Sequence, residues 1–141
     1  MELKTIDTGN LSFKYPVTWE LERADTYNNP DCVATLSKGE NNLINVVMFP
    51  TNVMLDDYKN FMEDSITDDG GIILKSDFVE IANMSGIKVH ANMDTPQINF
   101  DIHTYVFIEK GKIYIFELRT SESYLEPVSE FKDMISTLQL E

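Results

Sequence analysis

The sequence predicts an α+β fold: a single domain with a largely antiparallel sheet of about six or seven strands and helices on both faces. Three observations predict it. Short extended segments bounded by turn residues precede and follow one amphipathic helix, the last two extended segments are apolar on both sides, and a second amphipathic helix closes the chain. With 141 residues the chain has the size of one domain with one core, so we assign residues 1–141 to a single domain.

The first extended segments come in two pairs. Residues 11–15 and 19–23 flank a turn at Pro16, because proline presets the bend and cannot donate a hydrogen bond to a strand. Residues 32–37 and 43–49 flank Lys38-Gly39-Glu40-Asn41-Asn42, whose Gly and Asn residues suit the positive φ angles of a hairpin turn.

A helix is predicted over residues 55–66. Leu55, Tyr58, Met62 and Ile66 recur at intervals of three and four, and acidic residues occupy the other side. Gly70 and Gly71 end the helix. The acidic cluster between Asp56 and Asp69 is therefore interpreted mainly as a solvated helix face.

Four more strands are predicted at residues 72–80, 87–93, 99–108 and 112–120. Turns are expected at Met84-Ser85-Gly86 and at Glu109-Lys110-Gly111. Both sides of the last two strands are apolar, which indicates a sheet that is covered on both faces. A final helix carries one apolar stripe from Leu125 to Leu138 and begins near Pro127, since proline fits only the first turn of a helix.

Charge and cysteine content narrow the classes of function. Twenty-four acidic against 11 basic side chains give a formal charge of −13, so nucleic acid is not an expected partner. Cys32 is the one cysteine and is expected to be a small buried residue in a reducing environment. The sequence shows no signal peptide and no apolar run long enough to span a membrane. We expect a soluble cytoplasmic protein, or an extracytoplasmic one if a leader has been removed.

Residues 13–19, Phe-Lys-Tyr-Pro-Val-Thr-Trp, resemble the start of the PsbP-like superfamily, and Tyr15-Pro16-x-x-Trp19 is the most specific element. The strand at 43–49, the helix at 55–66, the segment Ser85-Gly86-Ile87-Lys88-Val89 and the closing helix fit the same pattern. This superfamily includes the photosystem II extrinsic protein, a Ran-binding nuclear-transport factor and DcrB-like proteins. The resemblance implies an antiparallel sheet with helices on both sides, used mostly for binding or assembly without a catalytic centre, and it carries over no functional residue.

Four residues are weak candidates for ligand binding. Trp19, Tyr58 and Tyr124 supply aromatic surface that would matter if they border a concave apolar pocket. His103 is the fourth. The main expectation is a non-catalytic binding or assembly module that meets a protein partner or a small ligand, with no catalytic residue, metal or cofactor; a homodimer is a further alternative.

The rival interpretation is a small hydrolase or metal-dependent enzyme that uses Asp101, His103 and Tyr105. These residues alternate along one predicted strand and share a face, so Asp101 and Tyr105 flank the imidazole that would act as a base. His90 points away from the apolar positions of its own strand, towards solvent or the second side of the sheet. The segment from Asp64 to Gly71 superficially resembles a calcium loop, but Ile66 stands at its third position, where an oxygen ligand is needed.

Overall fold

The computed structural model describes residues 2–22, 30–121 and 125–140. The described residues form a seven-stranded sheet and a three-stranded sheet, both antiparallel, together with two helices, which confirms the predicted α+β architecture. The strands are β1 Leu3–Asp7, β2 Leu11–Pro16, β3 Glu20–Glu22, β4 Cys32–Lys38, β5 Asn42–Pro50, β6 Ile72–Ile81, β7 Met84–Asp94, β8 Asn99–Glu109, β9 Lys112–Thr120 and β10 Gln139–Leu140. The helices are α1 Leu55–Asp68 and α2 Leu125–Ser136.

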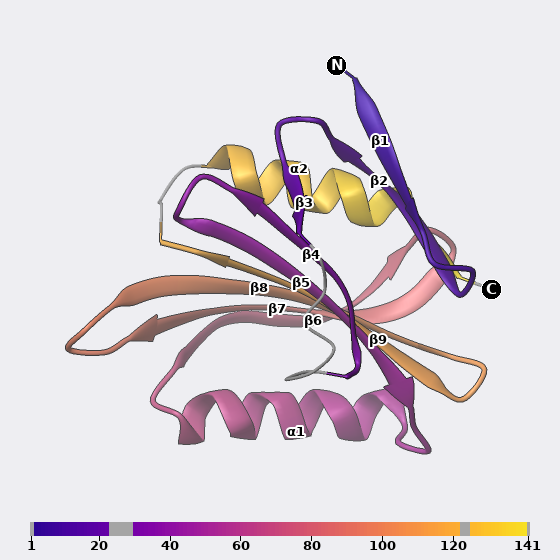
Figure 1. Ribbon diagram of the computed structural model, residues 1–141. Coiled ribbons are helices and arrows are strands. Elements are labelled where there is room, and N and C mark those ends of the chain that lie inside the picture. Colours follow the sequence, from indigo (N-terminus) through magenta and orange to yellow (C-terminus); the bar gives the residue numbers. More distant parts are fainter. Residues whose placement is uncertain (1, 23–29, 122–124, 141) are drawn as a thin grey trace.

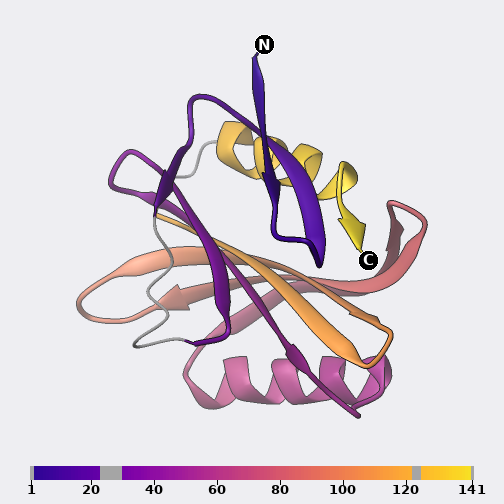
Figure 2. The same ribbon diagram turned by 45° about the vertical axis from the view of Figure 1, so that its right-hand side comes forward.

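The large sheet has the strand order β3-β4-β5-β9-β8-β7-β6 and forms the middle layer of the molecule (Figure 1). Helix α1 lies against one face. Helix α2 and the small sheet, in the order β1-β2-β10, lie on the other face, as the turned view also shows (Figure 2). We call these the α1 face and the α2 face. Strands β3 and β6 are the two edges of the large sheet.

Two strands were missed by the sequence-based prediction. Strand β1 pairs with β2, but its only buried side chain is Ile6, so it carries no alternating apolar signal. Strand β10 has only two residues. The predicted strand at 19–23 begins one residue later, because the amide of Trp19 donates to the carbonyl of Pro16 at 3.0 Å and closes the turn; Arg23 lies outside the described residues.

The predicted turn at Met84-Ser85-Gly86 was wrong. The turn is made by Ala82 and Asn83, which both have positive φ angles of 53° and 64°, as a two-residue hairpin loop requires. Gly86 instead lies inside β7 opposite Phe107, where an added Cβ would come within 2.7 Å of the phenyl ring. The glycine marks a close approach of backbone and ring, not a turn. The second predicted turn, at Lys110-Gly111, is confirmed by φ angles of 50° and 77°.

Both predicted helices are confirmed. Helix α1 buries Met62 and half-buries Leu55, Tyr58 and Ile66, and it ends where Gly70 takes a φ of +88°. Helix α2 includes Pro127 in its first turn and buries Phe131, Met134 and Ile135. Leu138, the end of the predicted stripe, is also buried, although the helix stops at Ser136.

Candidate functional site

His90, Asp101 and His103 come together on the α2 face. The pairing of β7 with β8 places His90 directly opposite His103, and their rings stack with centroids 4.0 Å apart and an interplanar angle of 17°. The Nε2 atom of His90 lies 3.2 Å from Oδ2 of Asp101. One donor atom from each of the three residues lies within 4.8 Å of the other two. The predicted shared face of Asp101 and His103 is confirmed, and His90 joins them from the neighbouring strand.

Burial differs within this cluster. His103 is only 6% exposed, and its Nδ1 atom is buried without a hydrogen-bond partner. Burial, followed by the charge of His90, lowers the pKa of His103 to about 4, so the imidazole is neutral at pH 7. His90 and Asp101 are about one-third exposed. Burial raises the pKa of Asp101, but hydrogen bonds from Asn92 and His90 outweigh this effect and hold it below its ordinary value.

Tyr105, the third residue of the enzyme interpretation, is buried in the core on the α2 face. Its ring packs edge-on against Phe131 of α2 at 5.4 Å, and the ammonium group of Lys88 lies over the ring, 5.6 Å from its centre. The side chain is 1% exposed, and burial raises the pKa of its hydroxyl. Tyr105 thus shares the predicted face with His103 but lies outside the group of three donor residues.

Trp19 is buried, with 2% exposure, in the same core as Tyr15 and Phe13. Its indole Nε1 has no hydrogen-bond partner among the described residues. An open hollow of about 530 Å³ lies beside it, lined by residues of β1, β2 and β3, and Trp19 is one of its walls. Most of the indole therefore serves packing, and only a rim of it faces this hollow.

Tyr58 borders a groove between α1 and the middle of the large sheet. The groove has a volume of about 330 Å³. Tyr58 and Phe61 line it from the helix, with their rings 5.8 Å apart, and Ile102 and Ile115 line it from the sheet. Polar groups of Thr104, Glu117 and Arg119 complete the wall. Burial, followed by the charge of Glu117, raises the pKa of Tyr58. Tyr124, the remaining aromatic candidate, lies outside the described residues.

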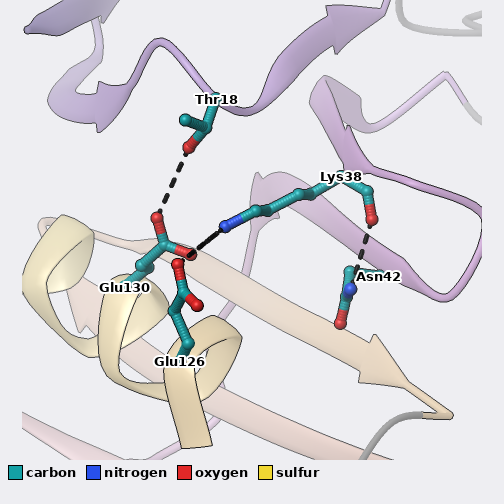
Figure 3. Close-up of polar contacts among 5 residues, drawn as sticks. All are labelled: Thr18, Lys38, Asn42, Glu126 and Glu130. Carbon is teal, nitrogen blue, oxygen red and sulfur yellow. Dashed lines mark hydrogen bonds and ion pairs between the residues drawn. The ribbon is translucent and has the colours of Figure 1, made fainter. Parts of the chain in front are cut away.

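An ion pair holds the amino-terminal half of α2 to strand β4 (Figure 3). The Nζ atom of Lys38 lies 2.7 Å from Glu130 and 3.3 Å from Glu126, and Glu130 also accepts a hydrogen bond from Thr18 at 3.5 Å. The side chain of Glu130 is only 10% exposed. Hydrogen bonding to Glu130 raises the pKa of Lys38 above its ordinary value despite partial burial. The ion pair links two elements of the fold. Its strand, β4, is separated from β8 and β7, which carry the histidine cluster, by β5 and β9.

The acidic face of α1 is exposed as predicted, with one exception. Asp56, Asp57 and Asp64 are exposed, whereas Glu63 is half-buried and accepts hydrogen bonds from Lys59 and Ser76. Met54, just before α1, is 70% exposed, and Met84 packs against the core. Cys32 is buried, as predicted.

The β6 edge carries large apolar side chains in solvent. Ile72, Leu74 and Phe78 are 60%, 56% and 56% exposed. The sequence-based prediction placed this strand correctly but did not identify it as an edge, because edge position depends on strand order.

The pairing of His90 with His103 could have been predicted from the sequence. A hairpin between 87–93 and 99–108 with its centre near residue 96 places these two residues opposite one another.

Neither α1 nor α2, the helices in the described part of the chain, is long and apolar enough to cross a membrane. No protein-family model matches the sequence. No curated protein matches it either.

Solved structures match over almost the whole chain. The solution structure of cyanobacterial PsbP from Synechocystis matches with a TM-score of 0.70 and 14% identity, covering 99% of this chain and 92% of that one. LpqN of Mycobacterium tuberculosis, described as involved in cell envelope biogenesis, matches with a TM-score of 0.68 and 8% identity, covering 99% and 90%. A Pseudomonas aeruginosa protein of unknown function, described as a putative regulator, matches with a TM-score of 0.62 and 10% identity, covering 100% and 99%. At these identities the likeness concerns the backbone, and on that ground the chain has the PsbP-like α+β fold.

Proposed function

We propose that the protein is a non-catalytic assembly module that associates with a second copy of itself along strand β6. The observation that carries the proposal is the exposure of Ile72, Leu74 and Phe78 on an edge strand of ten residues. The backbone groups on the outer side of an edge strand are available for pairing with another strand. Exposed apolar side chains on such an edge make that pairing favourable.

The sequence of β6 is complementary to itself. When two copies pair antiparallel about Ser76, each Lys75 lies opposite Asp77 of the other copy, and each Leu74 lies opposite Phe78. Opposite charges directly across a strand pair stabilise it, and like charges destabilise it. The register thus joins two ion pairs and two apolar pairs around one twofold axis.

Two features limit the strength of this association. Leu74 is the extra residue of an irregularity between Ile73 and Lys75, so its contact with Phe78 of the other copy departs from a regular ladder and the stretch that can add a partner strand is shorter. Each copy also carries a formal charge of −13, so the two copies repel one another at long range. We therefore expect a weak dimer that becomes stronger at high salt, where the repulsion is screened.

The test is sedimentation equilibrium of the full chain over a series of protein concentrations. Lys75→Asp should weaken the dimer at least about tenfold, because it places acidic groups opposite one another, and Lys75→Asp combined with Asp77→Lys should restore it. Phe78→Ser should also weaken it. Leu21→Ser is the matched control, since Leu21 is 49% exposed on the opposite edge strand β3. A monomer at every concentration, or a dimer unaffected by Lys75→Asp and Phe78→Ser, would contradict the proposal.

A second candidate function is the binding of a small apolar molecule in the groove beside Tyr58. Its volume is at the lower end of the range for ligand sites, and its apolar walls with a few polar groups suit a compact apolar ligand. A fluorescent anilinonaphthalene probe should bind the native protein and lose affinity in Ile115→Trp, which fills the groove. An unchanged affinity in that variant would place the probe elsewhere and exclude the groove.

A further inference from the structure

We propose that His90, Asp101 and His103 bind one divalent cation of the zinc type. The main expectation from the sequence includes no metal, but the fold brings two imidazoles and one carboxylate together on adjacent strands. These groups are ligands that Zn²⁺ commonly takes from proteins, and three protein ligands leave a fourth position for water. The proposal is independent of how the protein associates through β6.

The distances suit a tetrahedral ion after a small adjustment. Two ligands bound to zinc at about 2.1 Å in tetrahedral geometry lie roughly 3.4 Å apart. His90 Nε2 and Asp101 Oδ2 already lie 3.2 Å apart. The three donor atoms lie within 4.8 Å of one another, so closing around one ion needs a movement of about an ångström. It also needs a rotation of the stacked imidazole rings, because their lone pairs lie in the ring planes.

His103 provides the independent sign that a ligand belongs here. Its side chain is 94% buried, and its Nδ1 has no hydrogen-bond partner. Leaving a buried polar atom without a partner costs about 1–3 kcal/mol. A cation held between His103 and its two neighbours would give this ring a partner, and the neutral imidazole is the form that binds metals.

Asn92 supplies the support that a metal-bound carboxylate normally has. Its side-chain amide donates to Oδ1 of Asp101 at 2.7 Å, and Asn92 stands opposite Asp101 in the β7–β8 ladder. This bond fixes one carboxylate oxygen and leaves Oδ2 directed at His90. Outer contacts of this kind orient metal ligands, and their loss typically weakens binding about 10- to 100-fold.

The neighbouring charges set the strength of the site. Lys88 lies on the same face and exerts a repulsive charge effect on His103, and Lys75 stands opposite His90 in the sheet. Both ammonium groups oppose a cation. Lys75 is partly neutralised by Asp77 at 3.8 Å. His90 and Asp101 are part-exposed, so an ion can reach the cluster from solvent.

The experiment is a titration of the full chain, without a histidine tag, with Zn²⁺ in competition with a chromophoric chelator. We expect one ion per chain and a rise in the melting temperature, because the ion binds the folded state. Co²⁺ serves as a second probe, since nitrogen ligation in a tetrahedral site gives it visible absorption. Ca²⁺ and Mg²⁺, which prefer oxygen ligands, should not raise the melting temperature at the same concentration.

Four variants locate the ion. Asp101→Asn and His90→Gln replace part-exposed groups and should each weaken Zn²⁺ binding more than tenfold. Asn92→Ala should weaken it by about 10- to 100-fold through the orientation of Asp101. Asp133→Asn, which removes an exposed carboxylate from helix α2 on the same side of the sheet, is the matched control and should bind as the native chain does. Circular dichroism establishes that each variant is folded.

Two results would overturn the proposal. One is the absence of saturable binding of Zn²⁺ or Co²⁺ to the native chain. The other is binding that Asp101→Asn and His90→Gln leave unchanged, or that Asp133→Asn weakens equally, since the ion would then be held by scattered surface carboxylates.

Discussion

The two faces of the large sheet are packed to different degrees. Among the described residues, the core on the α2 face contains 18 buried apolar residues, and the core on the α1 face contains five. The α2 face is covered by a helix and by the three-stranded sheet, whose Phe13 packs edge-on against Phe116 at 6.0 Å. Helix α1 lies mainly against β6 and β7 and leaves the groove beside Tyr58.

This difference separates a stabilising face from an adaptable one. The core on the α2 face is larger and is covered by both a helix and a sheet, so the structure around its buried side chains has little freedom to fill a space when an atom is removed. Residues on the α1 face border an open groove, where side chains can relax and water can enter. The same chemical change should therefore cost more stability on the α2 face than on the α1 face.

Substitution of three methionines by alanine should show the largest difference in stability between the two faces. Met134 of α2 is 2% exposed, Met62 of α1 is 9% exposed, and Met54 is 70% exposed. We expect Met134→Ala to lower the free energy of unfolding by about 3–4 kcal/mol, Met62→Ala by about 2 kcal/mol, and Met54→Ala by less than about 0.5 kcal/mol. Urea denaturation followed by circular dichroism gives all three values. Equal costs for Met134→Ala and Met62→Ala would show that the two faces are equally rigid.

Two glycines allow a second comparison. A Cβ at Gly86 would lie 2.7 Å from both the Phe107 ring and the carbonyl oxygen of Val106. At Gly71, next to α1, it would meet the flexible side chain of Met93 at 2.5 Å, the Ile66 methyl at 2.7 Å and the Ile66 carbonyl oxygen at a longer 3.0 Å. We expect Gly86→Ala to cost about 2–3 kcal/mol and Gly71→Ala about 1 kcal/mol, since Met93 can turn away and a buried backbone carbonyl cannot. Thermal melts of the two variants test the order, and a larger loss for Gly71→Ala would contradict it.

The elements with strong local signals were predictable from the sequence. The stripe at Leu55, Tyr58, Met62 and Ile66 and the doubly apolar strands β8 and β9 gave the right element types and faces. The turn before β7 was misplaced because Gly86 has two physical uses. A glycine fits a positive φ angle, and it also fits a place where a ring crowds the backbone; only the position of Phe107 distinguishes them.

The candidate sites depended more on tertiary structure than on local pattern. Which side chains share the α2 face followed from alternation along β8, and this part was predictable for Asp101 and His103. The convergence of His90 required the register of β7 with β8, and the exposure of Phe78 required the position of β6 at the sheet edge. Likewise, Tyr58 borders a groove because helix α1 covers only part of the sheet face against which it lies. Strand order and helix placement are long-range properties that no single segment encodes.

The smallest expected difference concerns two glutamates with the same kinds of partner. Glu130 of α2 accepts hydrogen bonds from Lys38 and Thr18, and Glu63 of α1 accepts from Lys59 and Ser76. Their side chains are 10% and 31% exposed. Removing one partner of an enclosed ion pair leaves the other charge poorly solvated, whereas a half-buried pair within one helix keeps more contact with water and contributes less. We expect Glu130→Gln to cost about 1–2 kcal/mol and Glu63→Gln less than about 0.5 kcal/mol, with only the second loss disappearing at 1 M salt. Urea denaturation at low and high salt measures both, and equal losses that salt reduces equally would show that α2 holds its charges no more tightly than α1 does.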